Sequence, residues 1–72
     1  MKSYATNTKI KWPWGNGEGK GKIREVHHDT LTRKIKDAEV TRHGTDENPA
    51  YLIEQEDGDE VIKLHSEVEK DS

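Results

Sequence analysis

The turn Asp57-Gly58-Asp59 separates two short apolar runs and predicts a β-hairpin. The runs cover residues 51–56 and 60–64. An Asp-Gly turn between segments rich in β-branched and aromatic residues is a strong hairpin pattern. We therefore expect two antiparallel strands here, with Tyr51 and Ile53 on one face of the first.

The segment that contains both tryptophans predicts another strand. Ile10, Trp12 and Trp14 alternate with polar residues and Pro13, and a period of two is typical of a half-buried strand. Pro13 has no N–H for a ladder, so the strand should end there or lie at a sheet edge. Because side chains two apart share a face, we expect both indole rings to be buried or both to line one groove.

Residues 19–27 predict a bent strand. Gly19 and Gly21 share a face with Ile23, and alternate glycines in a strand indicate a bend or the close approach of another backbone. Val26 follows Ile23 by three residues, which breaks the alternation and predicts a β-bulge.

Residues 29–43 fit two structures. Leu31, Ile35 and Ala38 have helical spacing, whereas residues 39–42 and several β-branched positions favour strand. The pattern alone leaves both open. Residues 44–49 are rich in Gly, Asn, Asp and Pro and predict a loop.

The C-terminal segment predicts one helical turn. Ser66 is followed three residues later by Glu69, which is a capping-box pattern, and Val68 should fold back onto the end of the barrel. Four or five short strands suit a small barrel better than a sandwich of about seven strands. The expected core consists of Ile10, Ile23, Val26, Val40, Leu52 or Ile53, Ile62, Leu64 and Val68.

Size and composition predict one small domain without covalent cross-links. The 72 residues contain no cysteine, and only 28% are hydrophobic. The lack of cysteine makes the cytoplasm the default location, and no apolar run approaches the roughly 20 residues that span a bilayer. We also expect no signal peptide, loose ends at residues 1–7 and 71–72, and a monomer.

The charge is distributed unevenly. Residues 1–36 carry nine Lys/Arg and three acids, whereas residues 37–72 carry three Lys/Arg and twelve acids. Two separate partner surfaces are one interpretation. The other, which we favour, is that the two halves interleave as neighbouring strands and pair their charges.

Six short segments together resemble the Tudor domain of hypervirulence-associated proteins, over about residues 8–70. The resemblance implies an all-β fold, a five-stranded SH3-like (Tudor-type) barrel, and strand for residues 29–43. The family pattern has Gly where Asp37 stands, so the turn there would need Asp37 in a left-handed conformation, which Asp tolerates better than most residues. The segments are 11–15, 21–23, 33–35, 39–42, 47–53 and 57–63, and Asn48-Pro49-Ala50-Tyr51 is the most specific run.

The aromatic residues suggest a recognition site for a protein or peptide. A Tudor-type barrel can hold a methylated cation in an aromatic cage through cation–π attraction. Here Trp12, Trp14 and Tyr51 would form one wall, with Glu54 and Glu56 as an acidic side. Such a cage is incomplete, and the alternative is that one tryptophan belongs to the core while the other covers the barrel mouth.

Nucleic-acid binding is the alternative function. Basic residues beside tryptophans can hold phosphates and stacked bases. No nucleophile, P-loop or metal-ligand pattern is present, and His27, His28, His43 and His65 lack the spacing of a zinc site, so we expect no catalysis, metal or cofactor. The basic residues are Lys9, Lys11, Lys20, Lys22, Arg24, Arg33, Lys34 and Lys36.

Overall fold

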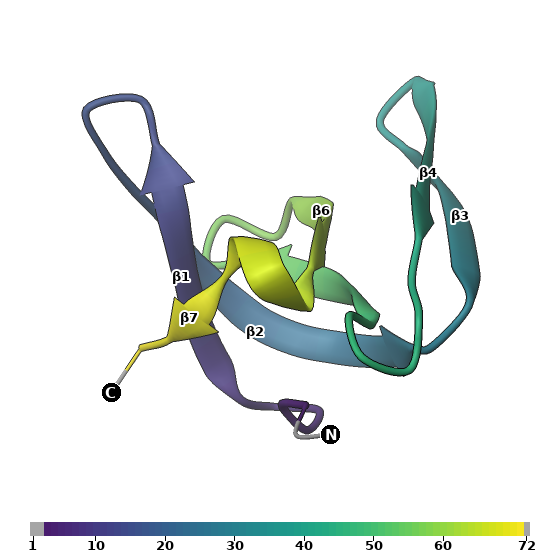
Figure 1. Cartoon of the computed structure of the whole chain (residues 1–72). Coiled ribbons are helices and arrows are strands. Elements are labelled where there is room, and N and C mark those ends of the chain that lie inside the picture. Colours follow the sequence, from purple (N-terminus) through teal and green to yellow (C-terminus); the bar gives the residue numbers. More distant parts are fainter. Residues whose placement is uncertain (1–2, 72) are drawn as a thin grey trace.

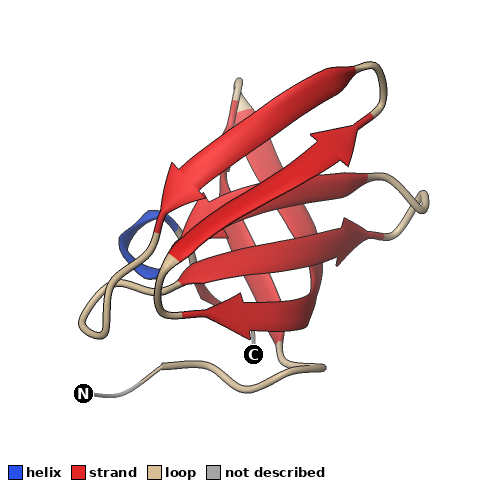
Figure 2. Ribbon diagram, turned by 90° about the vertical axis from the view of Figure 1, so that its right-hand side faces the viewer, coloured by secondary structure: helices blue, strands red, loops and turns tan. Residues whose placement is uncertain are grey.

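The structure, a computed structural model, describes residues 3–71 and consists of strands with one short helical turn (Figure 2). The elements in chain order are β1 (Lys9–Trp14), β2 (Gly17–His27), β3 (Thr30–Ile35), β4 (Ala38–His43), β5 (Ala50–Gln55), β6 (Glu60–Leu64), the 3₁₀ turn η1 (His65–Glu67) and β7 (Glu69–Lys70).

Five strands form one antiparallel sheet in the order β6-β5-β2-β1-β7. The other two, β3 and β4, pair only with each other and form an arm inserted between β2 and β5. In Figure 1 the β1–β2 hairpin and this arm rise at opposite ends of the curved β2, with β6 and η1 between them. The five-stranded SH3-like barrel with a helical turn before its last strand is therefore confirmed, with the β3–β4 arm as an addition.

Two features of its sequence, a β-bulge and a glycine, account for the curvature of strand β2. The register with β5 shifts between Ile23 and Glu25, which confirms the predicted bulge. A Cβ atom on Gly21 would lie 2.5 Å from the carbonyl oxygen of Glu54. The glycine is thus the site of close backbone approach that its position in the strand predicts.

Strand β5 lies at the centre of the core because both of its faces are buried. Tyr51 and Ile53 pack with Ile10, Trp12 and Ile23 on one face. The opposite face carries a second cluster, made by Leu31, Ala50, Leu52 and Ile62. Both Leu52 and Ile53 are therefore core residues, since the arm covers the face that would otherwise be open.

The predicted core is mostly confirmed. Ile10, Ile23 and Ile62 are buried, and four other expected residues are half-buried against the two clusters: Val26, Val40, Leu64 and Val68. The sequence predicted one tryptophan in the core only as the alternative to an aromatic wall, and Trp12 is that residue. It did not predict Leu31, Ala50 or Tyr51 there, where the structure has them.

The arm resolves the ambiguity of residues 29–43 in favour of strands. Its two-residue turn lies between Ile35 and Ala38, which pair with each other. The residue with positive φ is Lys36, at +55°, so the expectation for Asp37 is wrong. The Lys36 ammonium lies 3.0 Å from the Asp59 carboxylate of the β5–β6 turn.

The C-terminal helical turn is present but begins earlier than its capping pattern predicts. The backbone N–H of Leu64 donates to Oε1 of Glu67 at 2.8 Å, so Glu67 is the capping carboxylate. Glu69, the residue expected in that role, lies in β7 instead. Arg42 of the arm also donates to Glu67, which ties the arm to η1.

The segment before β1 contacts the barrel. The N–H of Tyr4 donates to the Tyr51 hydroxyl at 2.9 Å, and the N–H of Asn7 donates to the Ile23 carbonyl at 2.7 Å. Both residues fall within the stretch expected to be loose. Met1, Lys2 and Ser72, which were expected to be loose as well, lie outside the described residues.

Candidate functional site

The two tryptophans have different environments. Trp12 is 4% exposed and Trp14 is 72% exposed, so the expectation of a shared environment is wrong. Their side chains do lie on the same face of β1, but β5 pairs with β2 only from Gly21 onward and β7 pairs with β1 only as far as Lys11. Beyond those residues the hairpin is a two-stranded ribbon, and Trp14 lies past the end of the core.

Tyr51 is also a core residue, with no exposed surface. Its hydroxyl accepts the N–H of Tyr4 and lies 2.7 Å from Nδ1 of His65. Burial raises the pKa of the Tyr51 phenol above its ordinary value of 10.0. Trp12 and Tyr51 therefore offer no ring face to a ligand, and the three predicted aromatics do not form one wall.

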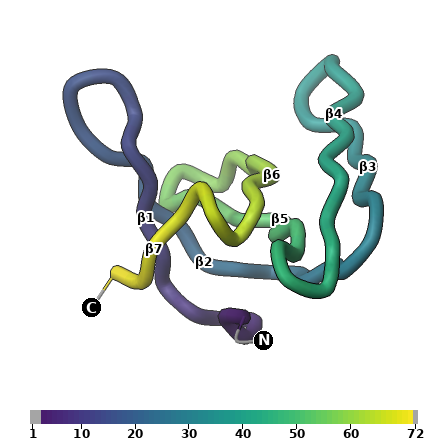
Figure 3. The backbone as a smooth tube through the Cα atoms, in the orientation of Figure 1, coloured from purple at the N-terminus to yellow at the C-terminus, as the bar shows by residue number. Residues whose placement is uncertain are grey.

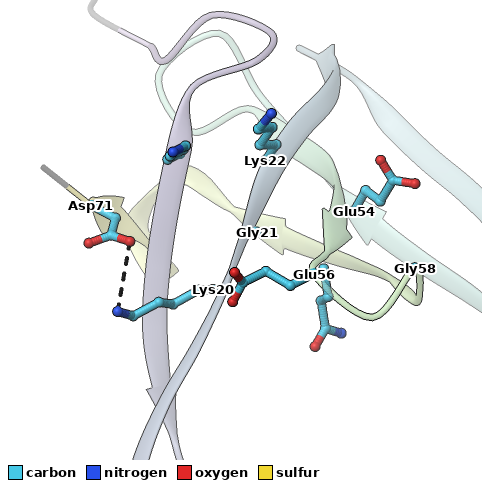
Figure 4. A pocket seen from close by; sticks show the side chains of 9 residues that line it. Lys20, Gly21, Lys22, Glu54, Glu56, Gly58 and Asp71 are labelled. Atoms are coloured by element: carbon cyan, nitrogen blue, oxygen red, sulfur yellow. Dashed lines mark ion pairs between the residues drawn. The ribbon is translucent and has the colours of Figure 1, made fainter.

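The two predicted acidic residues lie elsewhere, on the outer face of the sheet. Glu54 and Glu56 line a shallow depression of about 650 Å³ together with three lysines, Lys9, Lys20 and Lys22. Figure 4 shows Lys20, Lys22 and Glu54 on neighbouring strands around this depression. Trp12 faces the core on the opposite side, so the predicted aromatic–acidic groove is not assembled.

The β1–β2 ribbon brings together four of the eight predicted basic residues. Lys9 lies directly opposite Lys22, and Lys11 directly opposite Lys20. By alternation Lys9, Lys11, Lys20 and Lys22 share the outer face. Like charges in direct cross-strand opposition are unfavourable, so this face attracts carboxylates.

Carboxylates from the acidic half of the chain lie beside several of the basic side chains of β1 and β2. Lys11 lies 3.6 Å from Glu69 of β7, and Lys20 lies 4.0 Å from Asp71 (Figure 4). On β5, Glu54 lies 3.5 Å from Arg24. The basic and acidic halves therefore interleave and pair, as favoured from the sequence.

Of the other basic candidates, Arg24 belongs to β2, whereas Arg33, Lys34 and Lys36 belong to the arm and do not extend the lysine face. Arg33 donates to Oε1 of Glu25 at 2.6 Å, and His27 shares the same oxygen at 2.7 Å. The bond from His27 and the charge of Arg33 together lower the pKa of Glu25 below its ordinary value, against the opposing effect of its burial. Lys34 lies directly opposite Glu39 in the register of β3 and β4.

The run Asn48-Pro49-Ala50-Tyr51 serves the fold. Oδ1 of Asn48 accepts the N–H of Ser66 at 2.9 Å, and the carbonyl of Pro49 accepts the N–H of His65 at 2.9 Å. Ala50 is buried, and Tyr51 bonds to His65. The four residues together hold η1 against β5.

The fold and its surface define a class. An SH3-like barrel with an additional arm carries one exposed tryptophan on a projecting ribbon. Among residues 3–71 no three His, Asp or Glu side chains gather as a metal site, and no helix is long and apolar enough to cross a membrane. Barrels of the Tudor type are in general non-catalytic modules that bind protein or nucleic acid.

The comparison with protein families shows which family of this class the chain belongs to. The chain belongs to the family described as the TUDOR domain of hypervirulence associated proteins, whose family model matches residues 8–68. Neither the search of curated proteins nor the search of solved structures gave a match.

Proposed function

We propose that this domain is a non-catalytic recognition module that binds a segment of a partner protein, with Trp14 as its anchor. The supporting observation is the 72% exposure of Trp14, the one large apolar side chain that is exposed among residues 3–71. An indole ring in water is unfavourable, and tryptophan is enriched among the residues that dominate protein interfaces. Burying this ring against a partner would remove a large apolar area from water.

The surroundings of Trp14 suit this role. Its cross-strand neighbour is Gly17, and no atom lies within 4 Å of the position that a Cβ on Gly17 would take. Pro13 and the tight turn at Gly15, which has φ of +56°, restrict the backbone on either side of the ring. A partner side chain can therefore approach both the indole and the bare backbone beside it, and little ordering of the ribbon is required.

Protein is a better candidate than nucleic acid for this surface. A base could stack on Trp14, but the lysines lie on the opposite face of the ribbon, where Glu69 lies beside Lys11 and Asp71 beside Lys20. Phosphate contacts dominate nucleic-acid affinity, and a face on which carboxylates already lie beside two of the four lysines offers fewer of these contacts. The acids Glu54 and Glu56 take no part in the proposed site.

The test is a selection of twelve-residue peptides from a random display library on the purified domain, followed by affinity measurement. Trp14→Ala should weaken the selected peptides by about 30-fold or more. Lys34→Ala, an exposed change on the arm, is the matched control and should leave affinity unchanged. Failure to enrich any peptide, or equal binding by Trp14→Ala and wild type, would overturn the proposal.

A further inference from the structure

We infer that the partner segment binds as an added β-strand along the free edge of β2, at residues 17–20 beside Trp14. The inference rests on the proposed function and specifies how the same site is used. It follows from four observations: where the pairing of β2 ends, which backbone groups point outward there, how the other edge of the ribbon is closed, and which side chains border the free edge.

The sheet leaves this edge of β2 open. Strand β2 pairs with β1 along residues 17–22, but with β5 only from Gly21 to His27. After Gln55 the chain turns away, with the Gly58 N–H donating to the Gln55 carbonyl at 2.9 Å. Among residues 3–71, therefore, no strand occupies the position beside residues 17–20 that β5 occupies farther along β2.

The direction of the backbone groups follows from the alternation of a ladder. The N–H of Ile23 donates to the Thr8 carbonyl, and the Ile23 carbonyl accepts the N–H of Asn7, so Ile23 points toward the β1 side. Successive residues in a strand point to opposite sides. The N–H and carbonyl groups of Glu18 and Lys20 consequently point to the open side, where each can bond to an added strand.

The other edge of the ribbon is closed to such pairing. The carbonyl of Lys9 accepts the N–H of Asp71 at 3.0 Å, so by the same alternation Lys9, Lys11 and Pro13 point their backbone groups away from β2. At Pro13 there is no N–H to offer, and proline on an edge strand is a common device against strand addition. The ribbon thus has one protected edge and one that can accept a partner.

The side chains along the open edge indicate what the partner segment contains. Lys20 has Lys11 directly opposite, and among residues 3–71 the one carboxylate within ion-pair distance of its ammonium is that of Asp71, at 4.0 Å, so an acidic residue beside Lys20 is favoured. On the inner face, Gly17 leaves open space next to the indole of Trp14, which suits an apolar side chain. The expected segment is extended, with an acidic residue facing Lys20 and an apolar residue three positions away, beside Gly17, on the other face.

The depression on the outer face provides room for that acidic side chain. Its charged lining consists of three lysines, Lys9, Lys20 and Lys22, and three carboxylates, Glu54, Glu56 and Asp71. In Figure 4 the turn that contains Gly58 bends away from β2 below Glu54. A strand beside residues 17–20 would lie at the margin of this depression and place its outward side chains over Lys20.

The experiment uses a peptide from the selection above and amide hydrogen exchange of the ¹⁵N-labelled full chain. In the free domain the Glu18 and Lys20 amides should exchange fast, and saturation with peptide should slow both by about tenfold or more. Lys20→Pro and Lys20→Ala both remove the charged side chain, but only Lys20→Pro also removes the outward N–H, so it should bind about tenfold more weakly than Lys20→Ala, the matched control. A wild-type-like ¹⁵N spectrum for each variant establishes that it is folded.

The outcomes separate the two proposals. Protection of Glu18 and Lys20 together with the loss in Lys20→Pro supports strand addition. If Trp14→Ala abolishes binding but the two amides stay unprotected, the recognition role of Trp14 stands and strand addition is overturned. If Trp14→Ala has no effect while the amides are protected, the edge binds a strand without Trp14 as its anchor. If no peptide binds the wild-type domain, both proposals fail.

Discussion

The indole ring of Trp12 fills the space that a side chain on Gly19 would occupy. The two residues face each other across β1 and β2, and a Cβ atom on Gly19 would lie 2.4 Å from the ring. The Trp12 ring can therefore pack directly against the backbone of β2 only because Gly19 has no side chain, and the burial of Trp12 depends on this glycine.

Gly19→Ala should destabilise the domain. The added methyl group must displace a ring packed in the core, and overpacking of this kind costs about 1–3 kcal/mol. Gly17→Ala is the matched control because its Cβ would meet no atom within 4 Å. Urea unfolding followed by circular dichroism measures both, and equal midpoints for the two variants would contradict this account of Gly19.

The two tryptophans should differ sharply in their contribution to stability. Trp12→Ala removes a buried ring and should cost about 3–5 kcal/mol, which exceeds or nearly equals the stability expected of so small a domain. Trp14→Ala removes an exposed ring and should change the free energy of unfolding by about 0.5 kcal/mol or less. Comparable losses in thermal melts of the two variants would show that Trp14 is part of the core.

Tyr51→Phe should destabilise the domain through hydrogen bonding alone. The change keeps the ring but leaves the Tyr4 N–H and Nδ1 of His65 without their shared partner. The expected cost is about 1–3 kcal/mol, accompanied by faster amide exchange at Tyr4. An unchanged unfolding midpoint would mean that water replaces the hydroxyl at no cost.

Stability should fall in acid partly through Glu67. Burial alone would raise the pKa of this carboxyl, but the hydrogen bonds from Arg42 and from the Leu64 N–H outweigh it and hold the pKa below its ordinary value of 4.5. A carboxyl with a lowered folded-state pKa stabilises the fold above its unfolded value, and this contribution is lost as pH falls through the lowered pKa.

The variant Glu67→Gln tests this contribution, because a glutamine side chain does not titrate. The difference in unfolding free energy between wild type and Glu67→Gln should be largest near neutral pH and should shrink as pH falls below 4.5. Glu39→Gln, an exposed change on the arm, controls for the loss of one negative charge. A difference that stays constant across this pH range would exclude the Arg42–Glu67 contact as an acid-sensitive link.

Binding of single-stranded DNA should depend on the carboxylates that pair with the lysine face. We expect the wild-type domain to leave the anisotropy of a fluorescent oligonucleotide unchanged even at low salt. Combining Glu18→Gln, Glu69→Gln and Asp71→Asn removes the partners of Lys11 and Lys20, and this variant should bind with an affinity that falls steeply as salt is added. Salt-sensitive binding by the wild type would favour the nucleic-acid alternative.

Much of the fold could be predicted because it is encoded in local patterns. The β5–β6 hairpin follows from alternating apolar residues around an Asp-Gly turn, and the bulge follows from the spacing of Ile23 and Val26. These features depend on the side-chain period and on the backbone conformations that individual residues allow. The strand structure of residues 29–43 needed the family resemblance, because helical and strand periods overlap in that stretch.

The site could be predicted only in part. The sequence named Trp14 and the basic residues as candidates, but the register that brings Lys9, Lys11, Lys20 and Lys22 to one face of the ribbon came from the structure. The sequence could not show that Tyr51 is enclosed, because that requires Tyr4 and His65, which are distant in the chain, to meet its hydroxyl. The ordinary strand pattern of residues 17–20 likewise contains nothing that marks an unpaired edge.

The sequence by itself determined that Trp12 and Trp14 lie on one face of a strand followed by a tight turn. Only the tertiary structure decided that one is buried and the other is exposed. The physical reason is that the Trp12 ring, next to the point where β5 and β7 stop pairing with the ribbon, still packs on the core cluster of Ile10, Ile23, Tyr51 and Ile53, whereas Trp14 lies two residues farther along β1. Burial requires a second layer over the ring, and where that layer ends is set by contacts between distant segments, which no local period specifies.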